Sequence, residues 1–380
     1  MMTKQKAVLA VLIVLLCGSV HAQQYRMYVG TYTDKTASKG IYVFNYDAES
    51  GQFMPLGLAA ESKNPSFLAA SGDGKLVYAV NEVGDYESKS SGGVSAYQVE
   101  QTTGKLKFLN EVASRGADPC YIAFDKTGHV LLVANYTGGS VAVFPVQPDG
   151  RLKEASGVVQ HSGSSGNKER QEGPHAHWIE TSPDNHYALA ADLGSDELVV
   201  YRFDASTGRL SPNTPPFAKV SGGSGPRHAT FSPDGKFVYL LSELKSEVAV
   251  FRYNGGRLKE IQTVTALPAD YSAANDAAEI VMHRSGKFLY TSNRGADSIA
   301  VFRVDAKKGT LSLTENTPTQ GKTPRNFAID PTGQLLLVAN QESGNIVVFR
   351  IDPGTGRLTP MGKKLEAPAP VCIVFLKAKL

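Results

Sequence analysis

Glu247-Val-Ala-Val-Phe251, a short β-branched run that ends in an aromatic residue, decides the fold of this chain. Versions of it occur seven times in 380 residues, and successive final aromatics lie 53, 47, 57, 50, 51 and 47 residues apart. A motif that returns at this interval indicates a repeat architecture. The other copies are Gly40-Ile-Tyr-Val-Phe44, Gly93-Val-Ser-Ala-Tyr97, Ser140-Val-Ala-Val-Phe144, Glu197-Leu-Val-Val-Tyr201, Ser298-Ile-Ala-Val-Phe302 and Asn345-Ile-Val-Val-Phe349.

Turn phrases flank the copies on both sides. Ser232-Pro-Asp-Gly235 represents the first kind, which separates two apolar runs, and Thr207-Gly-Arg-Leu210 represents the second. Pro, Asp and Gly are the residues that tight turns favour. Each repeat therefore reads as four consecutive strands, A to D, and four-stranded units of this length are propeller blades. An array of β-sandwiches is the alternative, but its units would be about twice as long.

The two ends of the chain predict how the ring closes. The run from Arg26 to Thr31 reads as a strand B with no strand A before it. The last run, Pro370 to Phe375, reads as a strand A with nothing after it. We therefore predict an all-β, seven-bladed β-propeller with four antiparallel strands per blade. The C-terminal strand would join the first blade, so that the ring has no free edge.

The N-terminus reads as an export signal. Lys4 and Lys6 precede an apolar run from Ala7 to Leu16, and Val20-His21-Ala22 carries residues that signal peptidase accepts. We expect cleavage after Ala22, a periplasmic or secreted location, and a single propeller domain over residues 23–380. The apolar run, at about ten residues, is too short to span a bilayer, and no later stretch is long enough, so we expect no membrane insertion.

Charge and cysteine content exclude several classes of protein. The formal charge of +3 becomes +1 without the two lysines of residues 1–22, which gives no reason to expect nucleic acid or acidic membranes as partners. Two cysteines remain, Cys120 and Cys372, too few for a disulfide scaffold or a thiolate zinc site. They fall two blades apart in the repeat, so we expect free thiols. The sequence carries no signal for an oligomeric state.

Polar and charged residues gather at one face of the predicted ring. Strand A lines the central channel and strand B runs antiparallel to it, so the start of every A and the end of every B meet at one rim. A propeller needs no charge there, and buried charges are costly unless they are paired or used. These positions supply Glu82, Asn135, His175, His177, Asp192, Arg227, His228, Glu243, Glu279, Arg294 and Arg325.

Plain structural explanations exist for these residues one by one. Asn135, at the end of a strand B, is a typical turn residue that bonds nearby backbone, and Glu82 could simply pair with an arginine. His175 and His177 would share one face of a regular strand near Asp192, which suggests a metal pair with a carboxylate. That spacing fixes no third ligand. We predict neither a metal nor another cofactor.

The rim phrases resemble the seven-bladed propeller lactonase family, which includes a bacterial type of 6-phosphogluconolactonase and the fungal 3-carboxy-cis,cis-muconate lactonizing enzymes. The resemblance covers essentially all of residues 23–380. Its most specific carriers are Pro174-His-Ala-His177, Asp192-Leu-Gly194, Gly225-Pro-Arg-His228, Ser242-Glu243, Asn293-Arg-Gly295 and Pro324-Arg325.

The resemblance implies that a His, a Glu and arginines are the functional residues. It carries the family's Arg and Glu onto Arg227 and Glu243, and a further arginine onto Arg294. The His is either His175 or His177, and His177 is the one in register with Arg227. We expect the other rim residues to bind substrate: Arg325, which has the same register in the last full blade, His228, Asp192, Asn135 and Glu82.

The implied chemistry is hydrolysis of a sugar-derived or related lactone. Glu243 would activate a water, His177 or His175 would protonate the leaving oxygen, and Arg227 and Arg294 would hold the carboxylate or oxyanion. Because the phosphogluconate branch works in the cytoplasm, an exported chain is expected to act on an unphosphorylated lactone or sugar acid. Two alternatives remain: a propeller that binds such a ligand without turnover, and a muconate-type cycloisomerase.

Overall fold

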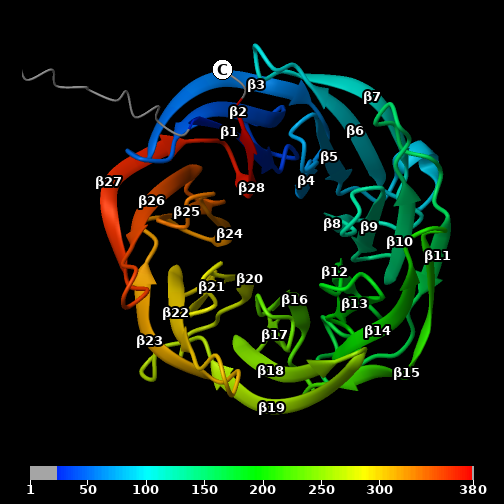
Figure 1. Cartoon of the computed structure of the whole chain (residues 1–380), viewed down its shortest axis with the longest axis vertical. Coiled ribbons are helices and arrows are strands. Elements are labelled where there is room, and N and C mark those ends of the chain that lie inside the picture. The colour runs from blue at the N-terminus through cyan, green and yellow to red at the C-terminus, as the bar shows by residue number, and fades with distance from the viewer. Residues whose placement is uncertain (1–23, 379–380) are drawn as a thin grey trace, which may run out of the picture.

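The computed structural model describes residues 24–378, which form seven four-stranded antiparallel sheets around a central axis (Figure 1). The predicted seven-bladed propeller is confirmed. From the axis outward, the first three blades are β28 (Pro370–Lys377), β1 (Gln24–Thr31), β2 (Gly40–Asp47), β3 (Gln52–Glu61); β4 (Leu68–Ala70), β5 (Leu76–Asn81), β6 (Gly93–Val99), β7 (Leu106–Ala113); and β8 (Pro119–Phe124), β9 (Val130–Asn135), β10 (Ser140–Pro145), β11 (Gly157–Gln160).

The remaining four blades follow chain order from the inner to the outer strand. They are β12 (Ala176–Thr181), β13 (Tyr187–Asp192), β14 (Glu197–Asp204), β15 (Arg209–Lys219); β16 (Pro226–Phe231), β17 (Phe237–Ser242), β18 (Glu247–Asn254), β19 (Arg257–Thr265); β20 (Ala277–Met282), β21 (Phe288–Asn293), β22 (Ser298–Val304), β23 (Leu311–Pro318); and β24 (Pro324–Ile329), β25 (Leu335–Asn340), β26 (Asn345–Ile351), β27 (Leu358–Glu366).

The repeated β-branched phrase forms the third strand of every blade. Side chains on both faces of this strand are mostly apolar, because neighbouring blades stack face to face and cover both faces of each sheet. In β22, for example, the first five residues are all buried. Between neighbouring blades, Phe288 and Tyr290 of β21 pack in one cluster with Leu336 and Val338 of β25. The hydrophobic core therefore lies in layers between blades, and the central channel is left to other side chains.

The predicted turns between strands A and B share one arrangement. The Ser232 hydroxyl donates to the Asp234 carboxylate at 2.7 Å and accepts the backbone N–H of Phe237 at 3.0 Å. Gly235 closes the turn at φ +69°, and in the version without glycine Asn185 adopts φ +61°. Positive φ suits Gly, and Asn tolerates it better than most residues. The turn residues thus occupy the positions where the backbone requires them.

The C-terminal strand closes the ring as predicted. β28 pairs antiparallel with β1, placing Lys377 opposite Tyr25 and Cys372 opposite Gly30. Cys120 and Cys372 are both free, as expected, and both are buried. Within residues 24–378 the structure contains no helix that is long and apolar enough to cross a membrane. The predicted export signal, residues 1–22 with cleavage after Ala22, lies outside the described residues.

Candidate active site

In four blades, a β-bulge near the start of the inner strand leaves one residue without a partner in the strand ladder. In β8 the register passes from Pro119 opposite Asn135 to Tyr121 opposite Ala134, which leaves Cys120 unpaired. β12, β16 and β24 show the same irregularity. Bulges re-aim side chains and are common beside active sites. The bulged residues of these four strands are Cys120, His177, Arg227 and Arg325.

A second set of side chains comes from the residue that directly follows strand B. Side chains alternate along a strand, so this residue faces the channel mouth when its predecessor faces into the blade. Residues of both sets line one open cavity of about 310 Å³, which also receives Arg170 and Asp276 from two loops. The contributors from the two sets are Cys120, His177 and Arg325, from bulges, and Glu82, Tyr136, Glu243 and Arg294, from B ends.

The channel narrows to a much smaller cavity next to this one. The smaller cavity shares some lining side chains with the larger one, and the residues that line it alone are Tyr32, Ser66, Phe67, Arg227, His228, Glu279 and Val371. The smaller cavity holds about 10 Å³. That volume is enough for about one water molecule. The cavity is therefore a pocket with a floor at the bulged residues, and a ligand would enter it from the rim.

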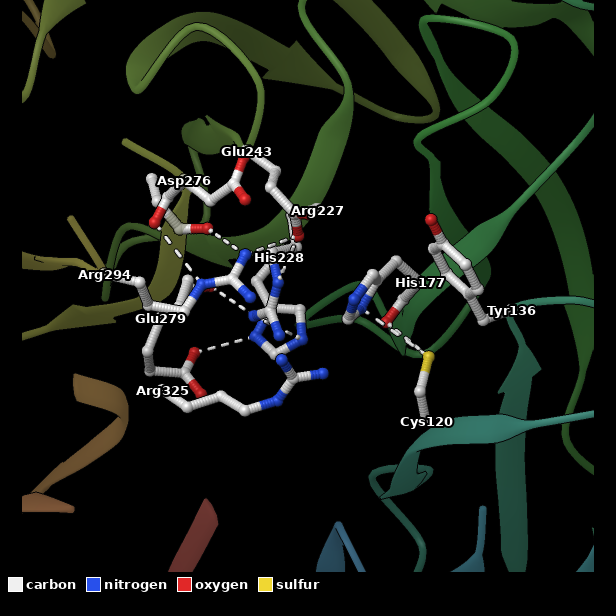
Figure 2. Close-up of polar contacts among 12 residues, drawn as sticks. Cys120, Tyr136, His177, Arg227, His228, Glu243, Asp276, Glu279, Arg294 and Arg325 are labelled. Carbon is white, nitrogen blue, oxygen red and sulfur yellow. Dashed lines mark hydrogen bonds and ion pairs between the residues drawn. The ribbon is translucent and has the colours of Figure 1, made fainter. Parts of the chain in front are cut away.

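Glu243 is the electrostatic centre of the pocket (Figure 2). Its Oε2 accepts from Arg227 Nε at 2.8 Å and lies 2.9 Å from Arg294 Nη2, while Oε1 accepts from Arg170 Nη2 at 2.6 Å. Burial raises the pKa of Glu243, but the charges of Arg294, Arg227 and Arg170 outweigh burial and bring the pKa to about 2. An ionised carboxylate this acidic is a weak base. The geometry favours a role in holding the arginines over the water-activating role inferred from sequence.

His177 is a neutral imidazole beside a neutral thiol. Its Nδ1 lies 3.6 Å from Cys120 Sγ. Burial, together with the charges of Arg227, His228 and Arg325, lowers the pKa of His177 well below its usual 6.5. Burial also raises the pKa of the Cys120 thiol well above its usual value, so Cys120 is no thiolate nucleophile. His177 is thus an uncharged imidazole among the cations of the pocket.

His228 and Glu279 support the pocket from below. His228 Nδ1 lies 2.9 Å from Glu279 Oε1, and Glu279 Oε2 accepts from Asn326 Nδ2 at 2.7 Å. His228 Nε2 lies 3.4 Å from Arg227 Nη1. Burial lowers the pKa of His228, although Glu279 opposes that change. Arg227 is therefore fixed between Glu243 on one side and this pair on the other (Figure 2).

Arg325, Tyr32 and Glu82 form a third group on the pocket wall. Arg325 Nη2 donates to the Tyr32 hydroxyl at 2.9 Å and its guanidinium lies 5.2 Å from the Tyr32 ring centroid, a cation–π contact. The Tyr32 hydroxyl donates to Glu82 Oε1 at 2.8 Å. Burial raises the pKa of Glu82, and the charge of Arg325 only partly opposes this. Glu82 therefore takes up a proton more readily than a carboxyl group in water does.

Two residues predicted to bind substrate lie away from the pocket. Asp192 Oδ2 is 2.6 Å from His161 Nδ1, and its Oδ1 accepts the backbone N–H of His175 at 2.9 Å. Asn135 Nδ2 donates to the Ser114 carbonyl at 3.1 Å. Each is the last residue of a strand B, and the position that faces the pocket is the next residue along the chain. Both side chains instead form hydrogen bonds with backbone groups of nearby loops.

His175 and His177 do not share one face of a regular strand, although both rings contact Tyr136. The His175 ring stacks on Tyr136 with a centroid distance of 4.6 Å, and its Nδ1 lies 3.1 Å from the Tyr136 carbonyl. The regular strand that would align the two histidines is interrupted, because the register shifts between Ala176 and Trp178. Within residues 24–378 no three His, Cys, Asp or Glu side chains gather in a way that could hold a metal ion.

Sequence reasoning missed Arg170, the third guanidinium on Glu243. The loop between β11 and β12 carries it, and the length of that loop was the only signal. Tyr136 was missed too, although it follows Asn135 directly and occupies the same position as Glu82. The hydroxyl of Tyr136 accepts from Arg170 Nη2 at 3.2 Å.

The ring is a seven-bladed propeller, and a pocket that three arginines line lies at one end of its inner strands. The family model described as lactonase, seven-bladed β-propeller, matches residues 26–375. The chain therefore belongs to the seven-bladed β-propeller lactonase family, and its relatives named 6-phosphogluconolactonase are carboxylic-ester hydrolases. The resemblance drawn from the rim phrases is confirmed.

Relatives match over almost the whole chain. A 6-phosphogluconolactonase of Bacillus subtilis (strain 168) is 40% identical over 356 residues, 93% of this chain and 99% of the relative. The crystal structure of a putative 6-phosphogluconolactonase from Bacteroides fragilis is 42% identical with a TM-score of 0.87, covering 94% of this chain and 99% of the other. The periplasmic gluconolactonase PpgL of Pseudomonas aeruginosa is 35% identical with a TM-score of 0.88, covering 94% and 100%.

Proposed function

We propose that this chain hydrolyses an unphosphorylated sugar-derived lactone in the pocket around Glu243 and His177. The observation that carries the proposal is the juxtaposition of a neutral imidazole with a carboxylate that holds three guanidiniums. Ester hydrolysis needs a proton acceptor for the attacking water and positive charge for the oxyanion, and this pocket offers both. The names of the relatives support lactone chemistry.

His177 carries the proton in this mechanism. Its Nδ1 faces Cys120, which leaves Nε2 for a water molecule that attacks the lactone carbonyl. The water proton passes to Nε2, and the imidazolium then gives it to the ring oxygen as the C–O bond breaks. The surrounding guanidinium charges destabilise the imidazolium, which speeds the second transfer.

The arginines stabilise the oxyanion, and Glu243 is a positioning residue for them. Guanidiniums that are already fixed by Arg227–Glu243 and Arg294–Glu243 contacts need little reorganisation when charge develops on the carbonyl oxygen. Glu82, whose pKa is raised, is a second source of a proton for the leaving oxygen. No step needs a cofactor.

We also propose that residues 1–22 direct export and that residues 23–380 act as one domain outside the cytoplasm. The lysines before the apolar run support export, and the relative from Pseudomonas aeruginosa is called periplasmic. An exported enzyme meets unphosphorylated lactones. Sequencing the N-terminus of the exported chain tests this; a mature protein that begins at Met1 would contradict it.

The function is tested with a panel of unphosphorylated sugar lactones and residues 23–380, followed by acid release in a pH-stat. We compare His177→Gln with His186→Gln, whose imidazole is 78% exposed on a turn of the same blade. A lost proton transfer is expected to lower kcat about 10²–10⁴-fold in His177→Gln and to leave His186→Gln unchanged. Retained binding of a sugar acid by parent and variant, with no turnover by either, would refute hydrolysis and favour a binding propeller.

A further inference from the structure

Arg170 stands apart from the other arginines of the pocket. Arg227 and Arg294 belong to inner parts of two blades, and their side chains are 3% and 12% exposed. Arg170 comes from the long loop between β11 and β12, and its side chain is 35% exposed. It is therefore the guanidinium on Glu243 that a molecule entering from the rim meets first.

The loop that carries Arg170 is fixed at both ends. At its start, His161 bridges the Asp192 carboxylate and the Tyr201 hydroxyl, each at 2.6 Å. Near its end, Gln171 Nε2 donates to Asp196 Oδ1 at 2.9 Å. These anchors are buried, so the loop has a defined position at the rim and places the Arg170 side chain in the pocket.

The anchor Asp196 also ties this loop to the strand that carries Arg227. Its Oδ1 accepts the backbone N–H of Gly225 at 2.7 Å, directly before β16. Its Oδ2 accepts the Ser165 hydroxyl at 2.5 Å and the Gly223 backbone N–H at 2.6 Å. One buried carboxylate thus sets the position of the Arg170 loop relative to the floor of the pocket.

The contacts of Arg170 allow it to change partner. Glu243 Oε1 accepts from Arg170, whereas Oε2 keeps Arg227 and Arg294. A ligand oxygen can therefore replace Glu243 on Arg170 without leaving the buried carboxylate uncompensated. The hydroxyl of Tyr136, 3.2 Å from the same nitrogen, lines the pocket beside it.

The depth of the pocket decides which part of a lactone Arg170 meets. The proton acceptor and the best-buried guanidinium, His177 and Arg227, lie at the floor, where burial makes charges act most strongly. If the carbonyl reacts there, as in the proposed function on which this inference rests, the ring substituents lie toward the mouth. We propose that Arg170 is a specificity-determining residue that binds the hydroxyl substituents of a sugar lactone.

The test compares two neutral lactones that differ in these substituents, D-glucono-1,5-lactone and δ-valerolactone, with spontaneous hydrolysis subtracted. Arg170→Met is matched by Lys168→Met, which removes the same charge from an exposed position of the same loop. Arg170→Met is expected to raise KM for gluconolactone about 10- to 100-fold, the effect of a hydrogen bond to a charged group, and to lower the preference for it over valerolactone by the same factor. Lys168→Met should resemble the parent.

An equal loss on both lactones, or none, would overturn the role of Arg170 while leaving the proposed function intact. If the parent hydrolyses neither of these lactones nor any sugar lactone of the panel, the proposed function fails. Calorimetric binding of D-gluconate then decides about Arg170 separately: weaker binding by Arg170→Met alone supports its role, and equal binding refutes it. Arg170→Lys keeps the charge but not the planar pair of donors, so its KM for gluconolactone is a second test of the role of Arg170. An unchanged melting temperature shows that the variant is folded like the parent.

Discussion

Replacing Glu243 by Gln removes the carboxylate that forms ion pairs with two deeply buried guanidiniums, those of Arg227 and Arg294. The pKa of this carboxyl falls from 4.5 to about 2, and each tenfold change in acidity corresponds to about 1.4 kcal/mol, so its ionised form contributes about 3 kcal/mol to the free energy of unfolding. The side chain is 4% exposed, which leaves little screening by solvent. We therefore expect Glu243→Gln to lose about 3 kcal/mol at pH 7.

The pH dependence of that loss follows from the direction of the pKa change. A carboxyl group whose folded pKa is lowered stabilises the protein fully above its unfolded pKa, and the contribution declines as pH falls toward the folded pKa. The difference between parent and Glu243→Gln should be complete at pH 5 to 7, fall to about 1 kcal/mol at pH 3, and vanish below pH 2. Urea unfolding at pH 7, 5 and 3 measures it.

Glu366→Gln is the control, because Glu366 pairs with Lys364 at the surface and is 74% exposed. Exposed pairs of this kind contribute about 0–1 kcal/mol. If Glu243→Gln unfolds within about 0.5 kcal/mol of the parent at pH 7, the three guanidiniums do not depend on Glu243, and its assignment as a positioning residue is wrong. The role of general base would then regain support.

Three further predictions concern the site and the ring. Because the pKa of His177 is lowered, the acid limb of kcat/KM should lie below pH 6.5; a limb at or above 6.5 would exclude His177 as the base. Cys120 and Cys372 are buried, and burial raises the pKa of the Cys372 thiol to about 12, so residues 23–380 should show no thiol that reacts with a disulfide reagent until urea exposes two. Deleting residues 370–380 removes β28 and uncovers the inner edge of β1, so we expect loss of soluble, cooperatively unfolding protein by circular dichroism, and an unchanged melting temperature would contradict the closure.

Sequence alone predicted the parts of this protein that the repeat dictates. The period, the turns and the closing strand follow from local patterns, and the rim positions follow from strand direction alone. Arg227 and Glu243 come together because one starts a strand A and the other follows the strand B beside it. The antiparallel pairing of strands A and B brings these two positions together in a blade whichever residues occupy them.

The rest needed contacts that no local pattern reveals. The path of the Arg170 loop depends on Asp196 and on the pairing of His161 with Asp192, all distant in sequence. Asp192 was expected in the pocket because it ends a strand B, whereas the side chains from the B ends that face the pocket belong to the residue after each strand B. The acidity of Glu243 likewise depends on three arginines from three separate segments.

The unpaired residue at each bulge has a consequence for how such a ring can change over evolution. Cys120, His177, Arg227 and Arg325 share one backbone setting, yet they are a thiol, an imidazole and two guanidiniums. Because no cross-strand neighbour constrains the side chain there, an exchange at a bulge alters the chemistry on the axis and leaves the blade behind it intact. The strands of the propeller thus hold a set of bulge positions at which single side chains can be exchanged. Substrate specificity can therefore change through substitutions in one blade at a time.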